Sequence, residues 1–297
     1  MSSVWLEQRE RSNLAAMRLI TWITRTLGRP AGRALLPPIC AYYLAFAPRA
    51  RKASRQFLQR VSGARPGIRE VYRHFHVFAR TLLDRIEMLS GDTSRFDLRV
   101  HGLATVERLL ERGQGCLLLG SHLGSVEILR AFGERHQKLV INLVMHEGNA
   151  RSTSRWLRQM APELARRIIA PGEAGTLLRV RECLARGEIV AMLGDRAFGS
   201  ERSTRCEFLG TGARFPSGPM LTAAVLGVPV VAFFCLHEGE QRYGVHFELI
   251  AERIELEASG RDAAVAPWIG RYVERLEAHA RLAPYNWFNF YDFWQEE

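Results

Sequence analysis

The sequence predicts an α/β protein in which helices flank a mixed central sheet, with an N-terminal helical extension that is amphipathic and apolar. The first observation is that short apolar runs alternate with helical stretches after Gly91. The second is the composition: 297 residues with 47% hydrophobic and 24% charged side chains exclude a disordered chain or a coiled coil. We therefore expect one continuous globular unit, with a basic helical region at 1–90 and an α/β domain at 91–297.

The N-terminal region carries the excess positive charge of the chain. Residues 1–65 contain twelve basic and two acidic side chains, so their net charge equals the +10 of the whole protein. Such a concentration indicates contact with an anionic membrane surface or with nucleic acid. Nucleic acid is the weaker interpretation, because long apolar segments separate the basic residues instead of leaving a purely polar basic face.

The apolar part of this region is suited to a membrane surface. Arginines recur every seven residues around Leu14–Leu27, which predicts an amphipathic helix. Ala34–Pro48 has no charge, but its 15 residues are fewer than the roughly 20 that a spanning helix needs. Pro30, Pro37 and Pro38 are expected to interrupt regular helix. We predict that this region lies in the headgroup layer, the alternative being a core helix with a solvated basic face.

A further helix is expected over Arg69–Leu89, where apolar residues recur with a helical period. His74 and His76 lie on it, but residues two apart point to different faces, so joint metal binding is not expected. The five cysteines are scattered and form no C-x-x-C pair. They therefore predict a reducing compartment, and neither a disulfide framework nor a zinc site.

Apolar runs and helical periodicity divide the body into elements. The runs predict strands at Cys116–Leu119, Leu139–Met145, Ile168–Ala170, Ile189–Leu193 and Val228–Leu236, with a further candidate at His246–Ile250. Helices are predicted near Val126–Arg135, Ser152–Met160, Ala174–Arg186, Gly218–Leu226 and Pro267–Leu282. The aromatic segment Trp287–Trp294 is expected to fold back on the core, with a membrane interface or an acyl-chain groove as the alternative.

Common catalytic motifs are absent from the sequence. It contains no P-loop, no G-x-G-x-x-G, no G-x-S-x-G and no H-E-x-x-H. Nucleotide-dependent enzymes, serine hydrolases of the nucleophile-elbow type and zinc peptidases are therefore disfavoured.

The segment Cys116–Arg130 carries the strongest candidate for chemistry. A buried type of strand ends at Gly120, and His122 follows at the edge of the sheet where ligands of α/β proteins bind. Glu127 can reach His122 only if the histidine lies in the turn before the next helix. A carboxylate on one ring nitrogen would raise the basicity of the other and let His122 take a proton from a hydroxyl. His-x4-Glu alone is a weak signal, and a structural histidine is the alternative.

Four short blocks follow one another along the chain: GSHLGSVE at 120–127, LGDR at 193–196, FPSG at 215–218 and VPVV at 228–231. They resemble, in order, the H-x4-D/E block, the acid-arginine block, the F-P-E-G block and the apolar strand of the lysophospholipid acyltransferase superfamily. Together with the basic, apolar N-terminus, they look most like the lipid A late-acyltransferase branch.

The resemblance implies transfer of an acyl chain from a thioester of acyl carrier protein or coenzyme A to a hydroxyl of a lipid or glycolipid. No metal is implied, and no cofactor beyond the thioester co-substrate. His122 would be the general base and Glu127 its partner. Arg196 would contact an anionic group of the substrate, and Asp195 would position Arg196 or the acceptor.

Further residues are expected at the site, some from these blocks and others, among them Asn149 and Arg151, from their place just after a predicted strand. Backbone N–H groups near the turn residues Ser121 and Gly124 would hold the developing oxyanion. Ser217 departs from the glutamate of F-P-E-G, which fits the lipid A-like branch better than a glycerol-phosphate acceptor. The candidates for substrate binding besides Asp195 and Arg196 are Phe215, Ser217, Gly218, Asn149 and Arg151.

These features predict a peripheral or monotopic protein on the cytoplasmic face of the bacterial inner membrane. Its expected partners are the acyl thioester, the acceptor lipid and an anionic membrane surface, with no nucleic acid. One alternative is a thioesterase or lipid hydrolase that uses the same pair with water. The other is a non-catalytic protein that binds anionic membranes and in which His122 is structural.

Overall fold

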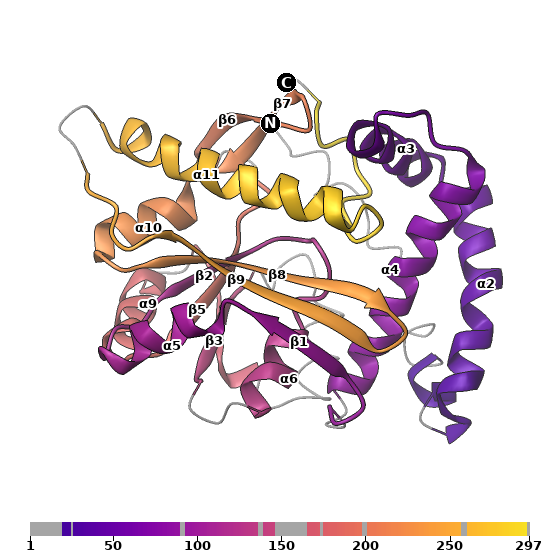
Figure 1. Cartoon of the computed structure of the whole chain (residues 1–297), viewed down its shortest axis with the longest axis horizontal. Helices are drawn as coiled ribbons and strands as arrows, with labels where there is room; N and C mark the ends of the chain where they lie inside the picture. Colours follow the sequence, from indigo (N-terminus) through magenta and orange to yellow (C-terminus); the bar gives the residue numbers. More distant parts are fainter. Residues whose placement is uncertain are drawn as a thin grey trace.

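The computed structural model describes residues 20–24, 26–89, 93–135, 139–145, 165–172, 175–197, 201–256 and 260–295. A central sheet flanked by helices confirms the predicted α/β class, and α2 and α4 run side by side at one end of it (Figure 1). Within the described residues, no helix combines the length and apolar character needed to cross a bilayer.

Seven strands form the central sheet in the order β1-β9-β8-β2-β5-β3-β4. Neighbouring strands are parallel except for β8 and β9, which form an antiparallel hairpin, so the sheet is mixed as predicted. The strands of this sheet are β1 (Asp97–His101), β2 (Leu117–Gly120), β3 (Ile141–Val144), β4 (Ile168–Ile169), β5 (Ile189–Leu193), β8 (Val230–Gly239) and β9 (Arg242–Ala251). A separate antiparallel pair consists of β6 (Ser203–Phe208) and β7 (Thr211–Pro216).

Helices cover both faces of the sheet (Figure 1). They are α2 (Gly28–Phe46), α3 (Pro48–Ser62), α4 (Ile68–Leu89), α5 (Leu103–Glu111), α6 (Ile128–Arg135), α9 (Thr176–Ala185), α10 (Gly218–Leu226) and α11 (Arg261–Leu282). Leu117 and Leu119 of β2 belong to the core under α10 and α11, whereas Leu118 belongs to the core against α5 and α6. Because β2 is buried on both faces, it forms a continuous apolar run that sequence analysis can recognise.

Most elements predicted for the body are confirmed with small shifts of their ends. The helices expected near 126–135, 174–186 and 218–226 are α6, α9 and α10, and the candidate strand at 246–250 is part of the longer β9. Strands β1, β6 and β7 and helices α3 and α5 were not anticipated, since polar side chains interrupt their apolar pattern. The helix expected at Ser152–Met160 and half of Leu14–Leu27 lie outside the described residues.

The expectation that prolines would interrupt the helix was wrong. Helix α2 runs without a break through Pro37 and Pro38, and Pro30 lies in its first turn, where a missing N–H costs nothing. An interior proline costs about 3 kcal/mol or more. Packing offsets this cost, because α2 lies along α4 and buries Leu36 and Cys40. Tertiary contact therefore overrides the local helix-breaking preference.

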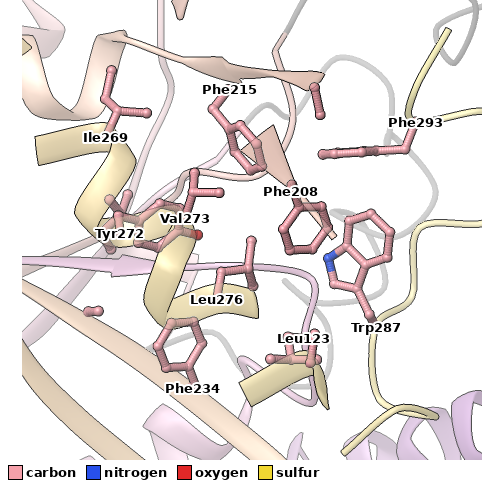
Figure 2. Close-up of a cluster of buried hydrophobic side chains, with 14 of the residues drawn as sticks. Leu123, Phe208, Phe215, Phe234, Ile269, Tyr272, Val273, Leu276, Trp287 and Phe293 are labelled. Atoms are coloured by element: carbon pink, nitrogen blue, oxygen red, sulfur yellow. The ribbon is translucent and has the colours of Figure 1, made fainter. Parts of the chain in front are cut away.

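The aromatic segment at the C-terminus packs back on the core, as expected. Trp287 is fully buried, and Phe293 is 9% exposed. Figure 2 shows these two rings beside Phe208 and Phe215 of the β6–β7 pair, and the ring centroids of Trp287 and Phe208 are 5.3 Å apart. Edge-to-face contacts of this kind hold the end of the chain against the body of the protein.

Candidate active site

The candidate site lies where β2 and β5 end. These neighbouring parallel strands pair Gly120 with Leu193, so the residues that follow them leave the sheet at the same edge. Two positions further along each strand stand His122 and Asp195. The sheet thus brings together a histidine and an acid that are 73 positions apart in the sequence.

The carboxylate of Asp195 binds His122 twice. His122 Nδ1 lies 2.8 Å from Asp195 Oδ1, and the backbone N–H of His122 donates to Asp195 Oδ2 at 2.9 Å. A carboxylate only accepts, so Nδ1 carries the proton and Nε2 holds a lone pair. Among the described residues, nothing hydrogen-bonds to Nε2, and 26% of the side chain is exposed. His122 therefore presents a basic nitrogen to whatever binds at this edge.

The electrostatics of the pair keep His122 neutral and Asp195 ionised. Burial and the positive charge of Arg196 lower the pKa of His122 below its ordinary value of 6.5, against the opposite effect of Asp195. Burial would raise the pKa of Asp195, but the contacts with His122 and the charge of Arg196 outweigh it and hold that pKa at about 2. This combination suits a general base with a fixed orienting carboxylate.

The expected hydrogen bond between His122 and Glu127 is not formed, and this corrects the sequence analysis. Glu127 Oε1 lies 2.9 Å from Arg85 Nε of α4, and the hydroxyl of Ser125 donates to Glu127 Oε2 at 3.0 Å. The turn before α6 is fixed beside β8 by the bond from Ser125 N–H to the carbonyl of Cys235. Glu127 consequently binds α4, and Asp195 takes the place at His122.

The turn after β2 depends on a glycine. Gly124 has a φ of +81°, and a Cβ on it would lie 1.6 Å from the carbonyl oxygen of Cys235. Neither the left-handed backbone nor the close approach to β8 admits a side chain. The predicted turn role of Gly124 therefore has a clear structural reason.

The N–H groups expected to hold an oxyanion are already engaged, which is a second correction. Four consecutive donors of this turn, at positions 122 to 125, have acceptors within the protein. The bonds run from His122 to Asp195, from Leu123 to the Ser121 hydroxyl at 3.3 Å, from Gly124 to the carbonyl of Asn286 at 2.8 Å and from Ser125 to the carbonyl of Cys235 at 3.0 Å. A buried turn must satisfy its own backbone, so these donors build the site instead of facing substrate.

Arg196 lies beside the pair and is held by the C-terminal segment. Its Nε donates to Asn289 Oδ1 at 2.6 Å, and one terminal nitrogen donates to the carbonyl of Phe288 at 3.2 Å. The guanidinium carbon also lies 5.6 Å from the ring centroid of Tyr291. These contacts fix the orientation of Arg196, and its predicted contact with an anionic group of the substrate stays a prediction.

The block FPSG at 215–218 contributes to the core and does not contact the pair of His122 and Asp195. Phe215 is fully buried among the aromatic rings of Figure 2. Ser217 is 1% exposed, precedes α10 and lies 3.0 Å, hydroxyl to hydroxyl, from Thr204. Gly218 begins α10, where a Cβ would lie 2.8 Å from the carboxylate of Glu201. Substrate contacts by these three residues stay predictions.

Other candidates are placed as follows. Asn149 and Arg151 lie outside the described residues. His74 is fully buried; its Nδ1 lies 2.9 Å from the Ser54 hydroxyl and its Nε2 lies 2.9 Å from the carbonyl of Trp287. In the part of the chain that the structure describes, no group of three or more histidine, cysteine or acidic side chains is arranged to hold a metal ion.

Sequence analysis missed two asparagines that build the site. The side chain of Asn289 binds both Asp195 and Arg196. The side chain of Asn286 binds the backbone of His237, and the backbone carbonyl of Asn286 accepts from the N–H of Gly124. The available signal was the presence of two polar amides in an otherwise aromatic segment. Both are buried, at 2% and 4% exposure, and a buried amide requires hydrogen-bond partners.

One comparison with known proteins gives a match. The family model described as bacterial lipid A biosynthesis acyltransferase matches residues 10–295, nearly the whole chain. No curated protein matches the chain.

Proposed function

The chain belongs to the bacterial lipid A biosynthesis acyltransferase family, and we propose that it moves a fatty acyl chain from a thioester of acyl carrier protein or coenzyme A to a hydroxyl of a lipid or glycolipid. The observation that carries the proposal is His122, whose Nδ1 is fixed on Asp195 and whose Nε2 is left to accept a proton. This arrangement can activate an alcohol without a nucleophilic side chain on the enzyme.

In the proposed reaction, His122 alone carries the proton from the acceptor hydroxyl to the leaving thiolate. Nε2 takes the proton of the acceptor hydroxyl while the oxygen attacks the thioester carbonyl carbon. The tetrahedral intermediate collapses, the carbon–sulfur bond breaks, and the departing thiolate takes the proton from His122. The products are the ester and the free thiol. Asp195 stabilises the transient imidazolium, as an orienting acid does in serine hydrolases.

Arg196 supplies the positive charge at the site in this proposal. It follows Asp195 directly and donates to the carbonyl of Phe288, whose N–H binds the carbonyl of His122. A guanidinium at this point would stabilise the oxyanion or bind an anionic group of a substrate. It takes over the role that sequence analysis assigned to the N–H groups of the turn, which are engaged elsewhere.

An apolar hollow between α9 and α10 supports binding of the acyl chain. It has a volume of about 590 Å³ and is lined by Leu177, Leu178, Val180 and Met192, among others. Met192 lies on β5, three positions before Asp195. A hollow lined by aliphatic side chains suits a hydrocarbon chain.

Exposed aromatic residues at the end of α2 support attachment to a membrane surface. Tyr42 is 60% exposed and Phe46 is 65% exposed. Helix α3 follows directly and carries Arg49, Lys52 and Arg55 on its first two turns. Aromatic and basic side chains in such proximity are typical of helices that lie in the headgroup layer. We propose peripheral attachment to an anionic surface through these helices.

The proposal is tested by product analysis. Full-length protein is incubated with labelled acyl carrier protein thioester, with and without a total bacterial lipid extract, and the label is followed. We expect a labelled lipid that requires the extract, which mass spectrometry then identifies. Free fatty acid as the only product would favour a thioesterase. Absence of turnover with both the carrier-protein and the coenzyme A thioester would favour a non-catalytic protein that binds membranes.

The rate of transfer is expected to fall in acid at an unusually low pH. Neutral His122 is the active form, and its lowered pKa keeps it neutral further into the acid range. In the pH profile of kcat/KM, the midpoint of the acid limb should therefore lie below pH 6.5 in the wild type. Arg196→Gln removes a cause of the lowered pKa and should move that limb to higher pH. A wild-type limb above pH 6.5, or an unchanged limb in the variant, would contradict this account of the electrostatics.

A further inference from the structure

The end of the chain is bound along the turn that carries His122. The segment 286–291, here called the C-terminal strap, forms a bridge between Trp287 and Leu123. The N–H of Phe288 donates to the carbonyl of His122 at 2.8 Å. His74 of α4 holds the other side of the strap through the carbonyl of Trp287. The strap is therefore anchored both to the turn and to the N-terminal helices.

Asn289 is the residue of this strap that reaches the charged groups of the site. Its Nδ2 donates to Asp195 Oδ2 at 2.9 Å, and its Oδ1 accepts from Arg196 Nε at 2.6 Å. The orientation of the carboxamide is unambiguous, because a carboxylate only accepts and a guanidinium only donates.

The bond to Asp195 completes the surroundings of that carboxylate. Oδ1 is used by the ring of His122, and Oδ2 receives both the backbone N–H of His122 and the amide of Asn289. Asp195 is fully buried, so water does not replace a lost donor without rearrangement. The amide thus determines how the carboxylate plane faces Nδ1 of His122.

We propose that Asn289 is a positioning residue of the transfer reaction, whose carboxamide fixes Asp195 and Arg196 relative to each other and thereby orients His122. This inference rests on the proposed function. Asn289 does not touch the reacting atoms; it acts through the two charged groups. A displacement of about 1 Å in such groups costs on the order of 100-fold in rate.

The test compares three substitutions of Asn289 in the full-length protein. Asn289→Leu keeps the shape and removes both bonds, and we expect kcat to fall about 10- to 100-fold. Asn289→Gln retains a donor and an acceptor and should recover part of that loss. Asn289→Asp places a carboxylate beside Asp195 and should move the acid limb of the pH profile to higher pH, since added negative charge raises the pKa of a histidine.

Asn286 provides the matched control. It is a second buried amide on the same strap, but among the described residues its side chain binds only the backbone of His237. Asn286→Asp introduces the same charge into the strap and should lower stability without moving the acid limb. If the role of the strap were merely structural, the two aspartate variants would have the same acid limb of the pH profile.

Two readouts separate this inference from the proposed function. Product analysis of the wild type tests the proposed function. The ratio of the kcat of each variant to that of the wild type tests the role of Asn289, whichever product is formed. The pKa of His122, followed by NMR of its imidazole, is measured without any turnover. It should rise in Asn289→Asp and stay unchanged in Asn286→Asp. Equal behaviour of these two variants, or wild-type kcat in Asn289→Leu, would overturn the inference.

Discussion

His122→Ala is expected to lower the rate of acyl transfer by at least about 10³-fold, and Asp195→Asn by nearly as much. The alanine variant has no base. The asparagine variant keeps the size of the side chain but replaces an ionised acceptor by a neutral amide, so the imidazole loses the charge that fixes its tautomer and stabilises its protonated form. The measurement is single-turnover transfer from the labelled thioester, with circular dichroism to verify that each variant is folded.

Glu127→Gln is the matched control for this prediction. It removes an acid five residues from His122 whose carboxylate binds Arg85 and Ser125. Because that carboxylate is not hydrogen-bonded to the base, we expect a loss of less than about tenfold, in the range of a partly exposed ion pair. A loss as large as that of Asp195→Asn would show that Glu127 is also a functional partner of His122, and would contradict the assignment of this role to Asp195 alone.

Gly124→Ala is expected to be the most destabilising small substitution in the turn, with a loss of about 3 kcal/mol or more in the free energy of unfolding. The new Cβ would lie 1.6 Å from the carbonyl oxygen of Cys235, and the backbone has a φ of +81°. Relief of this clash requires the turn to separate from β8, which breaks the bond between Ser125 and Cys235. Urea unfolding of the full-length protein measures the loss.

Gly63→Ala separates the effect of the clash from that of the backbone. Gly63 ends α3 with a φ of +72°, but a Cβ there meets no atom within 4 Å. Only the cost of the left-handed conformation remains, which is about 1 kcal/mol. If both alanine variants lose the same stability, the contact of Gly124 with β8 is not what the turn depends on.

The local part of the architecture could be predicted from the sequence. β2, β5 and β8 are buried on both faces and stand out as apolar runs, and α10 has the predicted bounds 218–226. The pair β6–β7 escaped because its polar and charged residues leave no continuous apolar run. Helix α2 was expected to break at Pro37 and Pro38, and its packing on α4 maintains it.

The sequence by itself determined that this protein is an α/β acyltransferase of the lipid A family, with His122 in a turn directly after a strand. Those features are local, since they depend on apolar runs, glycines and short ordered blocks. Only the tertiary structure decided which acid meets His122. Asp195 does so because β5 is the neighbour of β2, and Asn289 reaches Asp195 because the chain end returns to the same edge. Strand order and the return of a terminus arise from packing between distant segments, which no local pattern encodes.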